Sequence, residues 1–507
     1  MKTCLGVEFG STRIKAVAID SSFGVVSTGD HTWASQYENG VWTYSTEAVW
    51  NGLKDALSHL EHREDIAAMG ISAMMHGYLA FDKDWNLLVP FRTWQNTMTG
   101  PAAAQLSELF HFNIPQRWSI AHLYQAVLND EPHIAKLAHI TTLAGYVHFM
   151  LTGENVVGVG EGSGIFPLDY DTLDYDKALL DKFDDLIAAR GLPWKVRQLL
   201  PDIRLAGQCA GTLTEAGAQR LDGLLPVGVR FAPPEGDAET GMVATNAVAP
   251  RTGNVSAGTS IFSMVVLERP LARVYPEVGV VATPSGKPVA MVHCSNCTSD
   301  LNRWAAVFQE AFGLFGDRPS DGELFTRLYT LALSGAPDCG GITVCNYLTG
   351  ESVPHLDAGR PMIVRGTDAD FTLANFMRAH LYSTMVTLSI GMKLMEDEHI
   401  RIDSLTGHGG LFKTPVVGQR LLAAALETPI TVMETAENGG PWGMALLAAY
   451  MFTGAEKPLE EFLSERVFAS AQRSTLAPDP VDVEGFRRYR ARFEALLEVE
   501  KAAVQAL

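Results

Sequence analysis

Polar residues that could do chemistry surround a short turn near the start of the chain. In "VEFGSTRIKAVAI" (7–19), the Gly-Ser-Thr turn at 10–12 separates two apolar stretches, with Glu8 before it and Lys15 after it. Most hairpins need only Gly or Asn for their backbone angles. Two hydroxyls, a carboxylate and an ammonium group are more than the turn itself requires. Exposed N–H groups and hydroxyls in such turns bind anions.

Two further turns of this kind occur later in the chain. The segment "NVSAGTSIFSMVV" places Gly-Thr-Ser at 258–260 between apolar stretches and echoes the first segment, which suggests that each half of the chain begins with the same hairpin. A Gly-rich turn also spans 407–414. The sequence has no G-x-G-x-x-G fingerprint and no G-x-x-x-x-G-K-[ST] loop, so three such turns indicate a nucleotide site of another type.

Three further residues are candidates for a site. Asp237 stands in "PEGDAETG", a Gly-flanked segment that we expect to be a loop, where a carboxylate can act as a general base or a metal partner, or can simply cap a turn. Glu8 ends an apolar strand, where a buried carboxylate is costly unless it is paired or lies near a metal. His76, in "MMHGY", stands where a strand passes into a loop, and a structural histidine is the default there.

Composition limits the classes of protein. A chain of 507 residues suggests two or three domains. Apolar residues make up 47% and charged residues 19%, which is typical of a globular protein. The net charge of −19, from 39 basic and 58 acidic residues, argues against a nucleic-acid-binding face. A phosphate ligand would then be held by backbone N–H groups and a cation.

Targeting signals and cysteine pairs are not evident in the sequence. The first residues run directly into an apparent strand, and no apolar run approaches the ~20 residues of a membrane span, so we expect a cytoplasmic protein that does not contact a membrane. Six scattered cysteines do not suggest a disulfide scaffold. The lone C-x-x-C in "HCSNC" (293–297) lacks the second ligand pair of a zinc site, and we expect ordinary thiols there.

Strand and helix patterns alternate along the chain, which favours mixed α/β layers. The segment 231–266 is rich in Pro, Gly and Thr and is a candidate boundary, so we expect domains at 1–248 and 249–507. The other expected elements are an amphipathic helix at 45–63, an apolar strand entering a loop at 66–82, a long buried helix at 368–396, a Gly-rich turn, helix and strand at 405–432, a Gly-rich turn and helix at 438–454, and a charged terminal helix at 479–507.

On these features the chain resembles the FGGY family of carbohydrate kinases, within the superfamily of actin, hexokinase and heat-shock ATPases. The similarity covers nearly the whole chain. The segments that carry it, in the family's order, are "GVEFGSTRIKAV", "ISAMMHGYLAFDKDWNLLVPFRTWQN", "LTGENVVGVGEGSGIFPLDYDTLDYD", "GTLTEAG" with "GDAETG", "SAGTSIF", "YLTGESVPHLDAGRP", "GHGGLFKTP" and "NGGPWGMALLA". The resemblance implies an α/β, two-domain actin-like ATPase (ribonuclease H-like) fold with an interdomain cleft.

The resemblance also implies a role for each matching residue. Asp237 would take the proton from the sugar hydroxyl, and Met75, His76 and Asp237 would line the sugar pocket. Mg²⁺ would lie near Glu8 and Asp237, largely through water, and ATP would be the co-substrate. The implied nucleotide-binding residues are Gly10, Ser11, Thr12 and Lys15 in the first domain, Gly258 and Thr259 facing the same phosphates from the second, and Gly409, Gly410 and Thr414 against the adenosine.

Four residues depart from the family pattern. Glu8 stands where most members have Asp, and its longer side chain could shift the metal and lower the rate. Asn96 replaces the Asp of a Trp-x-Asp run, and Ala238 stands where Asn or Gln is common; both bear on which sugar is bound. Val353 replaces the Arg of a Glu-Arg-x-Pro run.

The leading expectation is an ATP-dependent sugar kinase acting on a ketopentose, with D-xylulose suggested by "MMHG". Ribulose, fuculose and glycerol-like polyols are close alternatives. A catalytically weak sugar- or nucleotide-binding regulatory protein is an alternative of another class, against which Asp237 and the three turns argue. A heat-shock-type ATPase would need a peptide-binding β domain, for which 455–507 is too short and too helical, and a nicotinamide dehydrogenase lacks its fingerprint. Dimers are common among members of the resembled family, so a homodimer is the assembly that the resemblance suggests.

Overall fold

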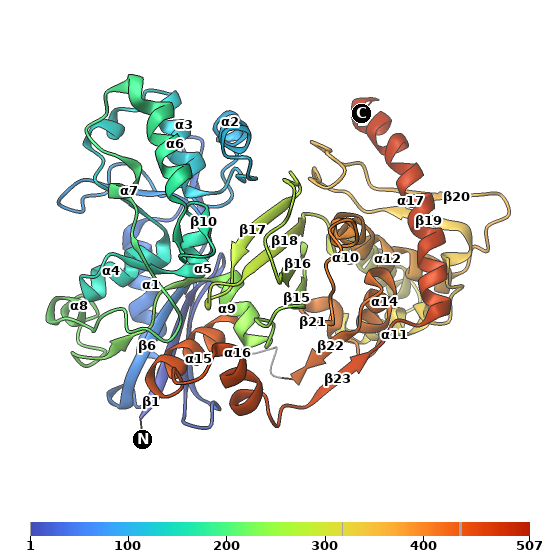
Figure 1. Cartoon of the computed structure of the whole chain (residues 1–507). Coiled ribbons are helices and arrows are strands. Elements are labelled where there is room, and N and C mark those ends of the chain that lie inside the picture. Colours follow the sequence, from blue (N-terminus) through green and yellow to red (C-terminus); the bar gives the residue numbers. More distant parts are fainter. Residues whose placement is uncertain (1, 317, 435–438, 507) are drawn as a thin grey trace. The chain divides into compact units, whose positions relative to one another are not determined.

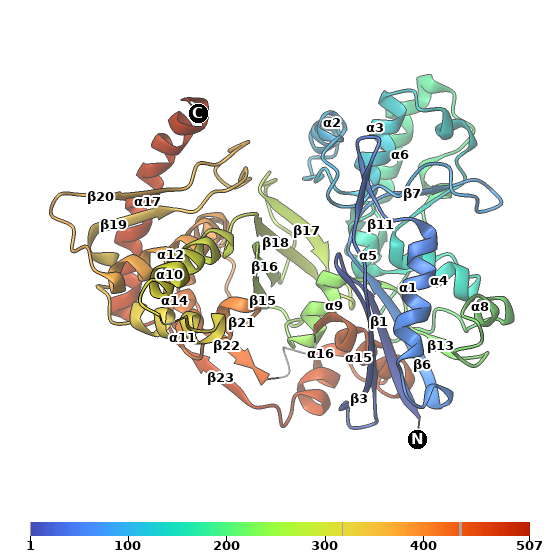
Figure 2. The same ribbon diagram turned by 180° about the vertical axis from the view of Figure 1, so that it is seen from behind.

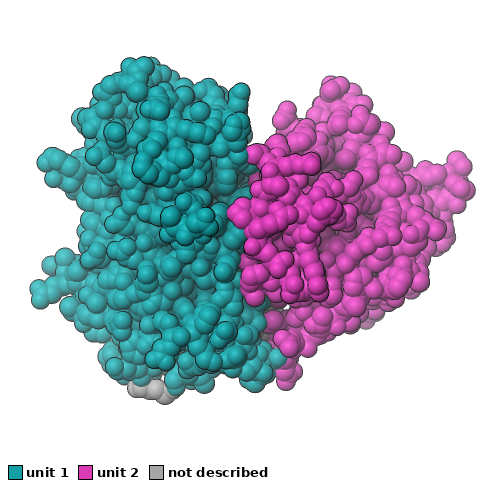
Figure 3. Space-filling model, viewed as in Figure 1, with its two compact units in different colours: residues 1–248, 279–289, 438–471 teal, residues 249–278, 290–437, 472–507 magenta. Residues whose placement is uncertain are grey.

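The computed structural model describes residues 2–316, 318–434 and 439–506. The chain forms two compact units, which Figure 3 shows in separate colours. Unit 1 comprises Met1–Val248, Gly279–Val289 and Asn438–Ala471, and unit 2 comprises Ala249–Val278, Ala290–Glu437 and Gln472–Leu507. The first crossing between units therefore follows residue 248. The expected division of the chain into domains 1–248 and 249–507 stays a prediction.

Unit 1 combines one main sheet with surrounding helices. Its strands are β1 (Thr3–Phe9), β2 (Arg13–Ile19), β3 (Val25–Thr32), β4 (Gln36–Glu38), β5 (Val41–Thr43), β6 (Ile66–Ala73), β7 (Leu79–Phe81), β8 (His139–Thr141), β9 (Val156–Gly158), β10 (Leu168–Asp169), β11 (Asp174–Tyr175), β12 (Asp202–Arg204), β13 (Arg230–Phe231) and β14 (Glu235–Gly236). Its α-helices are α1 (Thr46–Ser58), α2 (Gly100–Phe110), α3 (Ser119–Leu128), α4 (Leu143–Thr152), α5 (Val159–Ser163), α6 (Lys177–Ile187), α7 (Val196–Leu199), α8 (Glu215–Arg220), α9 (Asp237–Ala244), α15 (Gly439–Thr453) and α16 (Leu459–Phe462).

The main sheet of unit 1 has the order β13-β6-β1-β2-β3, with β14 also paired to β6. Strands β1 and β2 form the antiparallel hairpin that the first turn predicts, whereas β1 and β6 run parallel. Strand β1 is buried at every position except Glu8, which is partly buried. Such a continuous apolar run is typical of a strand covered on both faces. The expected strand at the start of 66–82 is confirmed as β6.

Helix α15 packs directly on this sheet and on α9, as Figures 1 and 2 show. A Cβ added at Gly6 of β1 would lie 2.0 Å from the carbonyl oxygen of Pro441. Glycine is therefore needed here for the helix backbone to approach the strand. The helix confirms the one expected at 438–454, although Asn438 lies outside the described residues. The helix expected at 45–63 is confirmed as α1, and Ser45 caps it.

Unit 2 has its own sheet and a largely helical core. Its strands are β15 (Thr252–Ala257), β16 (Ile261–Val266), β18 (Pro288–Cys294), β19 (Ile342–Cys345), β20 (Met362–Arg365), β21 (Ser404–His408), β22 (Ile430–Met433) and β23 (Arg473–Leu476), and β17 (Val278–Ala282) precedes β18. Its helices are α10 (Ser299–Gly313), α11 (Asp321–Ala332), α12 (Leu373–Gly391), α13 (Lys393–Asp397), α14 (Val417–Leu426) and α17 (Pro480–Ala506).

The sheet of unit 2 repeats the arrangement of unit 1. From β18 onward its order is β18-β16-β15-β21-β22-β23. Strands β15 and β16 form an antiparallel hairpin, and β15 runs parallel to β21, just as β1 pairs with β2 and with β6. The structure thus confirms that the two similar segments of sequence form the same hairpin.

Several other expected elements are confirmed, with adjusted bounds. The long helix expected at 368–396 is α12, buried along most of its length, followed by α13. The tail forms α17. In 405–432 the first residues extend β21 instead of forming a turn, because they pair with β15. All six cysteines are free thiols, and five of them, Cys294 and Cys297 included, are buried. No helix in the described ranges is long and apolar enough to span a membrane.

Candidate functional site

The predicted catalytic residues of unit 1 meet where three parallel strands end. Strands β1 and β14 both run parallel to β6, with Glu8 opposite Ser72 and Gly236 opposite Ala73. The carboxyl ends of such strands share one edge of the sheet, where ligands bind in open α/β sheets. The edge therefore brings together residues that lie far apart in the sequence.

Asp237 lies at the start of a helix, not in the loop that the sequence suggested. It is the first residue of α9, because β14 ends at Gly236 and the chain turns directly into the helix. The backbone N–H of Met75 donates to Asp237 Oδ1 at 3.1 Å. Burial raises the pKa of Asp237 to about 6, although the hydrogen bond from Met75 lowers it. A carboxylate with this pKa is largely ionised at neutral pH and can accept a proton.

Glu8 faces the same edge. Burial and the charge of Asp237 raise the pKa of Glu8 to about 8, whereas Lys15 lowers it. Lys15 stands opposite Glu8 on β2. The first turn of α15 also approaches the carboxylate, since a Cβ added at Gly440 would lie 1.7 Å from Glu8 Oε2. Position 440 therefore has no room for a side chain while Glu8 keeps this conformation.

The two carboxylates give an incomplete but suitable set of metal ligands. Their mutual repulsion would be relieved by a divalent cation. Within 2–316, 318–434 and 439–506, no three His, Cys, Asp or Glu side chains are grouped so that they could hold a metal. Mg²⁺ commonly takes one or two carboxylates and completes its ligands with water and substrate phosphates. Glu8 and Asp237 fit that mode of binding.

His76 is held as a neutral wall residue. It is buried, adopts a positive φ of 72°, and its Nδ1 lies 3.4 Å from the carbonyl oxygen of Gly164. Its ring stacks on Trp118 with centroids 6.1 Å apart. Burial and the charge of Arg117 lower the pKa of His76 well below its usual value. His76 can therefore shape a pocket, but it is unsuited to carry a proton at neutral pH.

Asn96, one of the departures from the family pattern, has a structural task. Its Oδ1 accepts from the backbone N–H of Trp42, and its Nδ2 donates to the carbonyl oxygens of Trp42 and Thr93. Only an amide can both donate and accept in this way, because an ionised carboxylate only accepts. Asn96 is thus engaged with the edge of β5. Val353, another departure, packs against the core of unit 2.

Three aromatic side chains hold the first turn, and sequence reasoning did not identify them. Trp33 Nε1 donates to the carbonyl oxygen of Gly10 at 2.7 Å, and Tyr44 Oη donates to that of Ser11 at 2.7 Å. Trp94 Nε1 donates to Ser11 Oγ at 3.3 Å. In a trans peptide the N–H points opposite to the C=O. The N–H groups of the two following residues are therefore directed away from the aromatic side chains.

Replacing Tyr44 with Phe tests the role in nucleotide binding that the family resemblance implies for the first turn, and we expect weaker binding. The variant loses one hydrogen bond that orients the peptide after Ser11 and keeps the buried ring. We expect the KM for ATP to rise about threefold to tenfold, in line with the ~1 kcal/mol of one hydrogen bond. Steady-state kinetics measure this, with Tyr37→Phe at an exposed tyrosine of β4 as the control. An unchanged KM for ATP in the Tyr44 variant would show that this bond does not orient the turn.

The second turn is supported in a similar way in unit 2, but it is one residue shorter. The N–H of Gly258 donates to the carbonyl oxygen of Ser260, whereas that of Gly10 donates to the carbonyl oxygen of Arg13. A Cβ added at Gly258 would meet nothing within 4 Å, and Thr259 is exposed. The carbonyl oxygens of Gly258 and Thr259 are again bound from behind, here by the N–H groups of Thr298 and Cys297. The corresponding N–H groups of the turn thus point to the open side.

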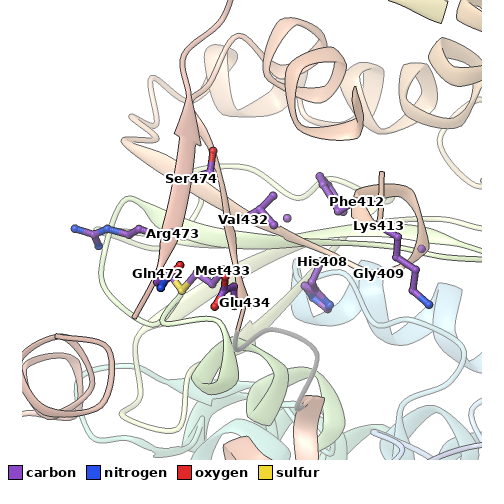
Figure 4. A pocket seen from close by; sticks show the side chains of 12 residues that line it. His408, Gly409, Phe412, Lys413, Val432, Met433, Glu434, Gln472, Arg473 and Ser474 are labelled. Carbon is purple, nitrogen blue, oxygen red and sulfur yellow. The ribbon is translucent and has the colours of Figure 1, made fainter. Parts of the chain in front are cut away.

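A cavity of about 950 Å³ opens beside this turn in unit 2. Gly409 lies at one end of the cavity and has a positive φ of 99°. Position 409 has no room for a side chain, because a Cβ there would lie 2.5 Å from the carbonyl oxygen of Ala257. In Figure 4, Gln472 and Arg473 lie on one side and Phe412 and Lys413 on the other. The lining residues are Gly407, His408, Gly409, Gly410, Phe412, Lys413, Val432, Met433, Glu434, Gln472, Arg473 and Ser474.

The predicted adenosine residues lie in or near this cavity. Gly409 and Gly410 line it, whereas Thr414 is buried and is not among the lining residues. Burial lowers the pKa of His408 to about 4, so its ring is neutral. Sequence reasoning did not identify the lining residues in and next to β22 and β23. These two strands come together by pairing, and no local sequence pattern reveals which distant strands pair.

A cluster of buried glutamates beneath Asp237 was also missed. Glu161, Glu235 and Glu239 are each at most 1% exposed. Their carboxylates pack against the glycines of the surrounding backbone, since a Cβ at Gly236 would meet Glu239 Oε2 at 2.3 Å. Burial raises the pKa of all three, that of Glu235 to about 8. The two glutamates that flank Asp237 in "PEGDAETG" were the available signal.

Replacing Glu239 with Gln is expected to reduce the loss of stability at high pH. An acid whose pKa is raised by folding stabilises the folded protein less as pH rises from its unfolded towards its folded pKa. The wild-type Tm should therefore fall as pH rises through the range of these carboxylates, up to about 8 for Glu235. The variant should show a fall smaller by about 2–4 °C, measured by thermal denaturation across this range. The exposed Glu154→Gln variant is the control; an equal slope in all three proteins would contradict the expectation.

Two family models match the chain over most of its length. The N-terminal domain of the FGGY family of carbohydrate kinases matches residues 3–241, and its C-terminal domain matches residues 253–452. The chain belongs to this family. Its fold is accordingly the two-domain, actin-like α/β fold that the sequence predicted.

Similar proteins carry several substrate names. A xylulose kinase of Staphylococcus xylosus is 21% identical over 470 residues, covering 89% of this chain and 91% of that protein. The ligand-bound xylulose kinase of Lactobacillus acidophilus has a TM-score of 0.80 at 18% identity and covers 98% of this chain and 99% of its own. A gluconate kinase of the same organism has the same TM-score and identity, with 98% of both chains covered. At this identity the structural likeness to FGGY kinases shows the fold and does not choose among sugars.

Proposed function

We propose that this FGGY kinase transfers the γ-phosphate of ATP to a hydroxyl of a ketopentose, with D-xylulose as the first candidate. The observation that carries the proposal is the position of Asp237. Its carboxylate lies at the shared edge of β1, β6 and β14, next to Met75, with a pKa of about 6. It is largely ionised at neutral pH and can accept the proton of a bound hydroxyl.

The two turns supply contacts for the phosphates. Phosphoryl transfer requires positioning and charge neutralisation more than covalent chemistry. Ser11 and Thr12 in unit 1, and Thr259 in unit 2, present backbone and hydroxyl donors. Gly258, whose own N–H is bound to Ser260, allows a phosphate to approach the backbone closely. Lys15 adds a positive charge, which is useful because basic residues are outnumbered by acidic residues in this chain. When bound near Glu8 and Asp237, Mg²⁺ supplies further positive charge against the phosphate oxygens.

The cavity beside the second turn is proposed to hold the adenosine. It begins at the carboxyl end of β21, adjacent to the end of β15, so a nucleotide seated there would direct its phosphates towards the 258–260 turn. Gly409 and Gly410 permit the close approach, and Met433 and Phe412 offer apolar surface to a base. Thr414 is buried outside the cavity lining, and we propose that it supports the lining residues and does not contact the adenosine itself.

Met75 and His76 are proposed to shape the sugar pocket beside Asp237. Xylulose is favoured by the names of the relatives that match nearly the whole chain. Ribulose, fuculose and polyols remain the alternatives, and Ala238 is the departure from the family pattern that bears on this choice. Asn96 bears on it less, because its amide is bound to the backbone of Trp42.

A coupled assay of ADP release tests the proposal. Wild-type protein with Mg·ATP is tested against ketoses, aldoses and polyols, in parallel with Asp237→Ala. We expect D-xylulose to give the highest kcat/KM and the variant to lose that turnover. Turnover with a different sugar would correct the substrate alone. Sugar binding without Asp237-dependent turnover would instead support a regulatory binding protein.

A further inference from the structure

Two sequence segments that the proposed function leaves unexplained meet in unit 2. They are "HCSNC" (293–297) and "YLTGESVPHLDAGRP" (347–361). The first overlaps residues 295–298, here called the support loop, which joins β18 to α10. The second contains Glu351, which is 1% exposed. Hydrogen bonds connect the two segments to each other and to the 258–260 turn.

The support loop binds the back of the turn. The N–H of Cys297 donates to the carbonyl oxygen of Thr259 at 3.0 Å, and that of Thr298 donates to the carbonyl oxygen of Gly258 at 3.2 Å. Thr298 Oγ1 donates to the same Gly258 oxygen at 2.8 Å. Thr298 directly precedes α10 but does not cap it with its hydroxyl. The hydroxyl is used on the turn instead.

These contacts set the direction of the donors in the turn. Fixing the carbonyl groups of Gly258 and Thr259 fixes the planes of the two following peptides. The N–H groups of Thr259 and Ser260 then point away from the support loop. A shift of the support loop would rotate both N–H groups. Their hydrogen bonds to a bound anion would then weaken steeply, because hydrogen-bond strength depends on the donor angle.

Glu351 anchors the support loop with its carboxylate. Oε1 accepts from the N–H of Ser295 at 3.1 Å, and Oε2 accepts from the N–H and the side-chain Nδ2 of Asn296 at 3.1 Å and 3.0 Å. Oε1 also accepts from the N–H of Ser352 at 3.2 Å. All four of these hydrogen bonds come from N–H donors. An ionised carboxylate suits this position because it accepts on every side.

Asn296 completes the connection in the opposite direction. Its Oδ1 accepts from the N–H groups of Leu348 and Thr349 at 2.9 Å and 3.1 Å. Asn346 Nδ2 donates to the carbonyl oxygen of Cys297 at 2.9 Å, which fixes the peptide whose N–H reaches Gly258. The turn is therefore linked to Glu351 by hydrogen bonds at both ends of the support loop and by the backbone of the loop between them.

We propose that Glu351 and Asn296 are positioning residues that hold the support loop so that the 258–260 turn presents its N–H groups to the terminal phosphates of the nucleotide. The inference rests on the proposed function for the identity of that ligand. Glu351 acts only through the support loop. Its loss should weaken binding of nucleotides with terminal phosphates and spare a nucleotide that has only an α-phosphate.

Titration calorimetry with Mg·AMP-PNP, a non-hydrolysable triphosphate, and with AMP tests the inference without a sugar. Glu351→Gln places an NH₂ group against N–H donors, and we expect the Kd for Mg·AMP-PNP to rise about tenfold while that for AMP changes less than about twofold. Glu500→Gln is the matched control. Glu500 is also a fully buried glutamate of unit 2 and also accepts a backbone N–H, from Arg360.

Circular dichroism shows whether Glu351→Gln folds, and Thr298→Val decides the question if it does not. This variant removes the hydroxyl bond to Gly258 and is expected to raise the Kd for Mg·AMP-PNP about threefold. Unchanged binding in a folded Glu351 variant, or equal weakening of both nucleotides, would overturn the inference. Wild-type protein that binds Mg·AMP-PNP but phosphorylates no sugar would contradict the proposed function alone, and wild-type protein that binds neither nucleotide would overturn both.

Discussion

Replacing Asp237 with Asn is expected to lower kcat about a thousandfold, within the range that a general base contributes. The amide keeps the shape of the side chain and can still accept the N–H of Met75 through its oxygen. It cannot take the proton from a sugar hydroxyl. Because burial raises the pKa of Asp237 to about 6, removing the charge should leave the Tm at neutral pH unchanged or raise it.

Three measurements define this prediction. ADP release gives kcat, and thermal denaturation shows that the variant is folded. Wild-type kcat/KM should fall as pH drops below about 6, because Asp237 must be ionised to accept the proton. The control is Asp82→Asn, a partly buried aspartate of unit 1 that accepts backbone N–H groups away from the strand edge. If Asp237→Asn kept a tenth or more of kcat, another group would be the base.

Replacing Glu8 with Gln is expected to raise the half-saturating Mg²⁺ concentration about tenfold or more and to lower kcat, because the variant loses the negative charge that we propose to lie beside the metal. Titration of activity with Mg²⁺ at fixed ATP measures both effects. In the wild type the half-saturating concentration should fall as pH rises towards 8, since Glu8 gives up its proton over this range. An identical Mg²⁺ curve for wild type and Glu8→Gln would exclude Glu8 from the metal site.

Two companion variants separate charge from position. Glu8→Asp keeps the charge on a shorter side chain and should retain most of the Mg²⁺ affinity. Gly440→Ala keeps Glu8 itself but places a methyl group 1.7 Å from the present position of Oε2. The carboxylate must then move, and we expect the same Mg²⁺ defect as in Glu8→Gln. A normal Mg²⁺ requirement in Gly440→Ala would show that the exact position of Glu8 is unimportant.

Short-range patterns in the sequence predicted the hairpins well. Apolar stretches on both sides of residues 10–12 and 258–260 specify strand, turn and strand, and both hairpins form. The pairing of β1 with β6, which brings Glu8 towards Asp237, depends on contacts between distant segments. Resemblance to a family, not periodicity, supplied that link.

The misassigned position of Asp237 has a local cause. Prolines and glycines in 231–241 suggested an extended loop, yet the segment holds the two-residue strand β14 and the start of α9. Strand pairing with β6 decides this outcome, and no pattern in so short a segment reveals it. Residues that act through packing were likewise invisible, among them Trp33, Tyr44 and the buried glutamates.

The two turns are both bound at their carbonyl oxygens but differ in how mutation can change that support. In unit 1 three of the four bonds to the turn come from the side chains of Trp33, Tyr44 and Trp94, and the fourth comes from the backbone N–H of Trp33 to the carbonyl oxygen of Thr12. In unit 2 two of the three donors are backbone N–H groups, which most substitutions leave in place. Single substitutions can therefore change the orientation of the first turn one hydrogen bond at a time. The orientation of the second turn changes chiefly when the support loop moves. The fold thus uses similar hairpins twice, one supported chiefly by side chains and one supported chiefly by backbone groups.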